Sequence, residues 1–220
     1  MALIAFALVF LALPPGRANA DALTIVAFGD SLTAGYMLPP DDGFPEQLQA
    51  ELKKKGYEDV TVKNAGVSGD TTSGGLSRLD WAVGPDADAV ILELGANDAL
   101  RGIDPAIARK NLEEMITRLQ KRGLPILLAG MLAPPNLGKD YAARFNPIYP
   151  ELAEKYNLIL YPFFLDGVAA NPKLNLGDGL HPTSEGVHEI VTRIMPDVET
   201  LIARTRKEAN GDAAETPQAN

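Results

Sequence analysis

The chain has 220 residues, of which 46% are apolar, and a formal net charge of −9 at pH 7. These values are typical of one soluble globular domain, and the negative charge argues against a nucleic-acid or anionic-membrane partner. Because cysteine is absent, disulfides, thiolate metal sites and a cysteine nucleophile are excluded. Two histidines are too few for a multi-histidine metal centre. We therefore expect neither a metal nor a cofactor.

Residues 1–20 differ from the rest of the chain. The stretch from Met1 to Leu13 is almost wholly apolar, and Ala18-Asn19-Ala20 fits the cleavage pattern of a secretory signal. The run is too short for a comfortable membrane-spanning helix, although no basic residue precedes it as a signal normally requires. We predict a signal peptide cleaved after Ala20 and a periplasmic or secreted mature chain without a stable membrane anchor. A buried N-terminal helix is the alternative.

Short apolar runs then alternate with amphipathic stretches. Strands are predicted at residues 23–28, 60–64, 89–94, 125–130 and 158–163. Helices are predicted at residues 45–55, 104–122, 141–156 and 184–204, the third interrupted by Pro147 and Pro150 and the last bent or broken at Pro196. This alternation indicates an α/β domain with a parallel sheet covered by helices on both faces. The polar stretch 205–220 is predicted to be a disordered tail.

Polar residues and glycines follow several of these strands directly. Ser31 comes just after the first strand, and a serine that begins a helix lies beside unpaired backbone N–H groups, which suits a nucleophile. Gly66 and Asn97 follow the second and third strands, and the carboxyl ends of parallel strands meet at one edge, where ligands bind. Asp178 and His181 in the last loop are expected over the same edge. The alternative for Asp30 or Ser31 is a simple helix cap.

Four sequence blocks in this order resemble the signature blocks of the GDSL, or SGNH, hydrolases. They are Gly29-Asp30-Ser31-Leu32, the segment Asn64–Thr71 with Gly66, Gly95-Ala96-Asn97-Asp98, and Asp178-Gly179-Leu180-His181-Pro182. The resemblance covers nearly all of a predicted domain at residues 21–204. It is strongest to the periplasmic branch with acyl-CoA thioesterase, lysophospholipase and arylesterase activities. It implies a flavodoxin-like three-layer α/β/α sandwich with a five-stranded parallel sheet in the order 2-1-3-4-5.

An acyl-transfer site needs a nucleophile, a base, a group that orients the base and donors for the oxyanion. We predict Ser31 as the nucleophile and His181 as the base, with Asp178 accepting from the imidazole. The resemblance implies three oxyanion donors: the backbone N–H groups of Ser31 and Gly66 and the side-chain amide of Asn97. The alternatives are a structural histidine, a turn-forming Asp178 and a helix-cap role for Asn97.

Apolar residues after the strands are candidates for an acyl groove, although core packing is an alternative for each. These substrate-binding candidates are Met37, Leu38, Met131, Leu132 and Pro134. The sequence therefore predicts a secreted serine esterase for small-molecule short-to-medium acyl or aryl esters, with acyl thioesters and lysophospholipids as further candidate substrates. A carbohydrate O-acetyl esterase or an acyltransferase would use the same site. A non-catalytic flavodoxin-like binding module is the alternative of a different class.

Overall fold

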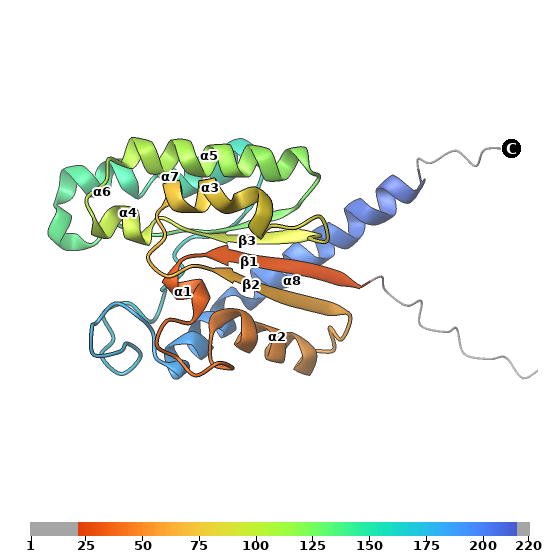
Figure 1. Ribbon diagram of the computed structural model, residues 1–220, viewed down its shortest axis with the longest axis horizontal. Helices are drawn as coiled ribbons and strands as arrows, with labels where there is room; N and C mark the ends of the chain where they lie inside the picture. The colour runs from red at the N-terminus through yellow and green to blue at the C-terminus, as the bar shows by residue number, and fades with distance from the viewer. Residues whose placement is uncertain (1–21, 215–220) are drawn as a thin grey trace, which may run out of the picture.

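Five parallel strands form the centre of the computed structural model, which describes residues 22–214 (Figure 1). Their order in the sheet is β2-β1-β3-β4-β5, as predicted. The strands are β1 (Leu23–Gly29), β2 (Val60–Gly66), β3 (Ala89–Glu93), β4 (Ile126–Ala129) and β5 (Ile159–Tyr161). All five predicted strands are present, because each is a short apolar run rich in branched side chains that the sheet buries.

Helices cover both faces of this sheet (Figure 1). On one face lie α3 (Thr72–Ala82), α5 (Pro105–Lys121) and α7 (Ile148–Tyr156), and on the other α2 (Phe44–Lys54) and α8 (Ser184–Ala214). Shorter helices follow individual strands: α1 (Ser31–Ala34), α4 (Ala96–Leu100), η1 (Pro135–Leu137) and α6 (Lys139–Phe145). The predicted α/β three-layer fold is therefore confirmed. Its carboxyl edge collects the loops that follow β1, β2, β3 and β4.

Prolines divide the helix predicted at residues 141–156 into α6 and α7. Pro147 precedes the first residue of α7, and Pro150 lies in its first turn, where the missing N–H has no intrahelical acceptor to lose. Pro196 lies inside α8, which continues past it. Proline thus ends one predicted helix and is tolerated in another.

The predicted disordered tail needs correction, because α8 continues ten residues beyond Arg204 to Ala214. Thr205 is buried, and its hydroxyl donates to the Leu201 carbonyl. Arg206 binds Asp59 at 2.5 Å, and its guanidinium lies 5.8 Å from the centre of the Tyr57 ring. The burial of Thr205 and the tertiary contacts of Arg206 hold this polar segment as helix. Residues 215–220 and the predicted signal peptide lie outside the described residues.

Candidate active site

Ser31 lies at the sharp turn where β1 ends. Asp30 precedes it as the N-cap of α1, and one Asp30 carboxylate oxygen accepts the Leu32 N–H at 3.0 Å. Gly35, in the left-handed conformation, closes the helix after a single turn. Ser31 is therefore the first helical residue, and its own N–H has no intrahelical acceptor. Asp30 is the helix cap, while Ser31 is presented at the carboxyl edge of the sheet.

The structure brings Ser31, His181 and Asp178 into one hydrogen-bonded chain. His181 Nε2 lies 2.9 Å from Ser31 Oγ, and His181 Nδ1 lies 2.6 Å from Asp178 Oδ2. The other Asp178 oxygen accepts the N–H groups of His181 at 3.0 Å and Leu180 at 2.9 Å. These backbone bonds and the imidazole lower the pKa of Asp178 to about 2. Since an ionised carboxylate only accepts, the proton belongs on Nδ1, and Nε2 is free to accept from Ser31.

The other two predicted oxyanion donors, the Asn97 amide and the Gly66 N–H, each already have a hydrogen-bond acceptor within the protein. Asn97 is on α4, and its amide nitrogen donates to Asp30 Oδ2 at 3.1 Å. The Gly66 N–H donates to the side-chain oxygen of Asn64 at 3.0 Å. An amide has a second N–H, so Asn97 retains a donor for a ligand. The Gly66 N–H becomes available to a ligand only if its hydrogen bond to Asn64 breaks.

Two glycines allow the turn at Ser31 to pack closely. A Cβ at Gly66 would lie 2.3 Å from the Ala34 nitrogen, in the backbone of α1. A Cβ at Gly29 would lie 2.0 Å from Thr33 Oγ1 and 2.4 Å from Glu93 Oε2. Any side chain at either position would displace α1, and with it the serine.

Arg78, on α3, joins the ends of β1 and β2 beneath the site. Its guanidinium donates to the carbonyls of Gly29 at 2.7 Å and Ala65 at 2.8 Å, and to Asp70 at 2.6 Å. It also lies 4.2 Å from the centre of the Phe28 ring. The sequence does not predict this role of Arg78, because a single arginine in a weakly amphipathic stretch is normally expected to lie on the surface.

A buried carboxyl pair, also missed by sequence reasoning, lies under Ser31. Glu93 Oε2 accepts from the Thr33 hydroxyl at 2.7 Å and from the Asp30 N–H at 3.3 Å. Its other oxygen is buried without a hydrogen-bond partner among the described residues. Burial, and then the neighbouring charge of Asp30, raise the pKa of Glu93 well above its ordinary value. Both effects favour the protonated form of Glu93.

An apolar cavity of about 410 Å³ opens beside Ser31, Asn97 and His181. Most of its lining is aliphatic or aromatic and comes from the loops after β3, β4 and β5 and from the segment before Asp178. The apolar lining residues include Leu100, Leu132, Ala133, Pro134, Phe163, Leu165, Ala169 and Ala170. Such a cavity fits an acyl or aryl group held next to the serine.

Two of the five predicted substrate-binding residues, Leu132 and Pro134, line this cavity, and three do not. Met131 lies in the hydrophobic core, where only 2% of it is exposed, and the lining of the cavity begins with the next residue, Leu132. Met37 adopts a positive φ and is 74% exposed, and Leu38 packs against the core. For these three residues the sequence-based assignment is corrected.

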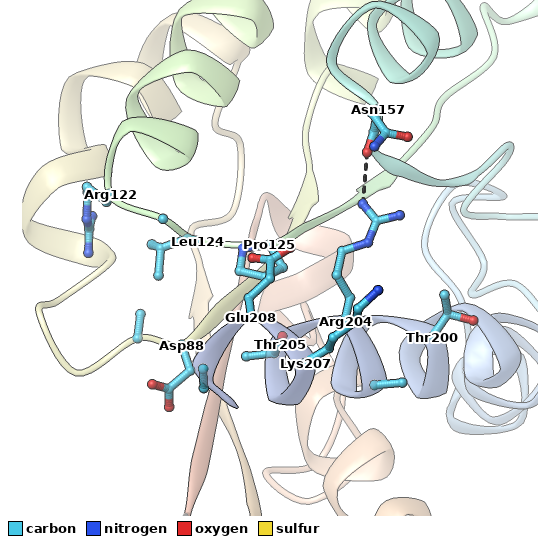
Figure 2. Close-up of a pocket in the computed structure, with 14 residues that line it drawn as sticks. Asp88, Arg122, Leu124, Pro125, Asn157, Thr200, Arg204, Thr205, Lys207 and Glu208 are labelled. Atoms are coloured by element: carbon cyan, nitrogen blue, oxygen red, sulfur yellow. Dashed lines mark hydrogen bonds between the residues drawn. The ribbon is translucent and has the colours of Figure 1, made fainter. Parts of the chain in front are cut away.

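A larger groove of about 1100 Å³ lies at the opposite, amino edge of the sheet (Figure 2). It runs between the last turns of α8 and the segments before β3, β4 and β5. Its walls carry the charged side chains of Asp88, Arg122, Arg204, Lys207 and Glu208. It has neither a histidine nor a serine, so it lacks the groups for acyl transfer. His188 is exposed on α8 and belongs to neither site.

No helix within residues 22–214 has the length and apolar character needed to cross a bilayer.

Comparisons with known proteins find related sequences and structures. The family model described as "GDSL-like Lipase/Acylhydrolase family" matches residues 27–188. An arylesterase of Vibrio mimicus is 43% identical over 162 residues, which are 73% of this chain and 80% of that protein. The thioesterase 1/protease 1/lysophospholipase L1 of Escherichia coli K12 is 33% identical over 194 residues, covering 88% and 91%. The crystal structure of AlinE4, an SGNH-hydrolase family esterase, superposes with a TM-score of 0.70 at 47% identity and covers 83% of this chain and 98% of its own.

Proposed function

This chain belongs to the GDSL-like lipase/acylhydrolase family of esterases and thioesterases, and we propose that it hydrolyses short-to-medium acyl or aryl esters through Ser31, His181 and Asp178. The observation that carries the proposal is the hydrogen-bonded chain from Asp178 through His181 to Ser31 at the mouth of an apolar cavity. The apolar lining supports an acyl or aryl group over a sugar. The names of the two curated relatives support both esters and thioesters as substrates.

In the proposed reaction, Ser31 Oγ attacks the carbonyl carbon while its proton passes to His181 Nε2. Asp178 holds the imidazole by Nδ1 and stabilises the positive charge that forms. The tetrahedral oxyanion is bound by the Ser31 N–H and the Asn97 amide, and by the Gly66 N–H once it leaves Asn64. His181 then returns its proton to the leaving alcohol or thiol, and the acyl group stays on Ser31. Water, deprotonated by the same imidazole, releases the acid and restores the serine.

The proposal is tested by hydrolysis of p-nitrophenyl esters of increasing acyl length and of one acyl-CoA. We expect Ser31→Ala to abolish turnover of every substrate, and Ser77→Ala, which removes an exposed hydroxyl on α3, to leave it unchanged. A fluorophosphonate probe should label the wild type and Ser77→Ala but not Ser31→Ala. Activity or labelling that survives in Ser31→Ala would overturn the assignment. A wild type that is labelled but inert on the whole panel would redirect it to another acyl donor or acceptor.

We also propose that the mature protein is exported, beginning at Asp21 after removal of residues 1–20. The support is the apolar leader with its small-x-small ending. Intact-mass analysis of the protein recovered from the periplasm or medium of an expressing bacterium tests this. A mass that retains residues 1–20 in the exported fraction would contradict it.

A further inference from the structure

A buried acidic residue, Asp30, lies directly beside the nucleophile and has no role in the proposed reaction. Asp30 is fully buried, yet its carboxylate contacts two functional elements at once. Oδ1 accepts the Leu32 N–H at 3.0 Å, and Oδ2 accepts from Asn97 Nδ2 at 3.1 Å. The first bond caps the helix that begins at Ser31. The second reaches the side chain proposed to bind the oxyanion.

The hydrogen bond between Asp30 and Asn97 determines how the Asn97 side-chain amide is oriented relative to the substrate cavity. An amide has an oxygen at one end and an NH₂ group at the other, and rotation by 180° exchanges them. An ionised carboxylate only accepts, so Asp30 selects the orientation in which the NH₂ group faces it. One N–H then bonds Asp30, and the second remains for a ligand in the cavity that Asn97 lines. In the reversed orientation the developing oxyanion would meet the amide oxygen.

We propose that Asp30, in its ionised form, is a positioning residue that fixes the Asn97 amide as a donor to the oxyanion. The inference rests on the proposed function, because it concerns the same acyl-transfer site. Asp30 does not touch the substrate in this scheme. It acts through Asn97, and its effect is confined to the step in which the oxyanion forms.

The neighbouring Glu93 supports this assignment of charge. Two adjacent buried carboxyl groups cannot both ionise at low cost, so the pair carries one negative charge near neutral pH. Each carboxyl accepts two hydrogen bonds, but those of Asp30 are divided between both of its oxygens, whereas those of Glu93 fall on Oε2 and leave Oε1 without a partner among the described residues, where a proton can sit. The charge therefore resides on Asp30 and the proton on Glu93.

Burial raises the pKa of Asp30 to about 6, and its hydrogen bonds offset part of that effect. Ionisable and charged groups face it from several elements. They are Glu93 on β3, Asp70 in the loop before α3, Tyr149 on α7 and His181 in the last loop. Arg78 on α3 binds the carbonyl of Gly29, the residue before Asp30. Asp30 is thus ionised at pH 8, and it gains a proton as the pH falls through about 6. When Asp30 is protonated, its O–H can donate to the Asn97 amide oxygen. The reversed orientation of the amide is then no longer excluded.

A double-mutant cycle on kcat at pH 8 tests the inference. Asn97→Ala removes one oxyanion donor and should lower kcat by about 10²–10³-fold. In Asp30→Asn, the new side-chain oxygen keeps the cap on Leu32, and the new NH₂ group faces Asn97 and selects the wrong amide orientation. We expect a loss in kcat of about the size seen in Asn97→Ala, with KM little changed because the oxyanion exists only in the transition state. The double variant should be no slower than Asn97→Ala alone.

Asp98→Asn is the matched control, because Asp98 is a buried carboxylate next to Asn97 in sequence but binds Thr72 instead, at 2.6 and 2.7 Å. Its effect on kcat should multiply with that of Asn97→Ala. If the effects of Asp30→Asn and Asn97→Ala also multiply, or if Asp30→Asn leaves kcat unchanged, the inference is wrong. Residual activity in Ser31→Ala would instead reject the proposed function itself.

The pH dependence provides a second test that does not require Asp30→Asn to fold. A proton that lowers activity steepens the acid limb of log kcat against pH. In the wild type, protonation of Asp30 as the pH falls through about 6 should add such a contribution to the slope. In Asn97→Ala there is no amide for Asp30 to orient, so this contribution should be absent and the slope smaller. Equal slopes in the two proteins would contradict the inference.

Discussion

At the scale of single residues, Glu93 is buried at a cost in stability that depends on pH. Its folded-state pKa is raised, so the unfolded chain loses the proton at a lower pH than the folded protein. Between these two pKa values the folded state binds more protons, and the free energy of unfolding decreases as the pH rises. Below the unfolded-state pKa, near 4, this cost is absent.

Glu93→Gln should remove that pH dependence, because a neutral amide mimics the protonated acid at every pH. We expect the variant to match the wild type at pH 4 and to be more stable than the wild type at pH 8, because only the wild type loses stability as the pH rises. Urea unfolding at the two pH values measures the difference. Glu114→Gln, at an exposed residue of α5 that pairs with Arg118, should give a much smaller dependence. A Glu93→Gln variant whose relative stability falls with pH would show that Glu93 is ionised.

Gly66 provides a second test at this scale, because its hydrogen atom faces the backbone of α1. Gly66→Ala should destabilise the fold by about 1–3 kcal/mol through overpacking and reduce esterase activity at least tenfold, since Ser31 moves with α1. Gly177→Ala adds the same methyl group where nothing lies within 4 Å and should leave the melting temperature unchanged. Equal behaviour of the two variants would refute the packing argument.

Sequence reasoning identified the proposed reacting groups but not the residues that hold them in position. Ser31, Asp178 and His181 were predicted from residue type, order and position after strands, and the structure brings them together. Glu93 was missed because its role depends on a tertiary neighbour: it lies on β3 and meets Asp30 at the end of the adjacent strand β1. A sequence read one segment at a time contains no signal for such contacts.

At the scale of secondary-structure elements, α3 stabilises the carboxyl edge through Arg78. Removal of its guanidinium leaves Asp70 without a counter-ion and two strand-end carbonyls without their donor. We expect Arg78→Met to cost about 3–5 kcal/mol of unfolding free energy. Arg118→Met, which removes an exposed pair with Glu114 on α5, should cost less than about 1 kcal/mol. Urea denaturation with matched m-values compares them, and similar losses would contradict a stabilising role for the buried guanidinium.

The same helix shows why some elements escaped prediction. Strands and long amphipathic helices were found because their apolar period is visible in the sequence. The start of α3 contains Ser73, Gly74 and Gly75, which are poor helix formers. Gly75 is nevertheless required, because a Cβ there would lie 2.3 Å from the Leu94 side chain. Helix α3 therefore forms through tertiary packing that overrides local preference, as does the last part of α8.

At the scale of the whole molecule, the net charge of −9 should slow the approach of anionic substrates but not that of neutral ones. An acyl-CoA carries several negative charges, so the field of the protein slows its approach. Raising the ionic strength from about 10 to 200 mM shortens the Debye length from about 30 to under 10 Å and weakens this repulsion. We expect kcat/KM for an acyl-CoA to rise several-fold over that range, while that for a p-nitrophenyl ester stays constant. An equal response of both substrates would exclude an electrostatic cause.

The direction of the strands also places the cavity mouth at one end of the molecule and the two ends of the described chain at the other. The mouth beside Ser31 lies at the carboxyl ends of the strands, whereas the described chain begins before β1 and ends with α8 at the opposite end (Figure 1). A purification tag, a fused domain or a solid support joined through either end would therefore project away from the mouth. Such an immobilised enzyme would present its cavity outward to the surrounding solution, so tethering should preserve its turnover of small esters.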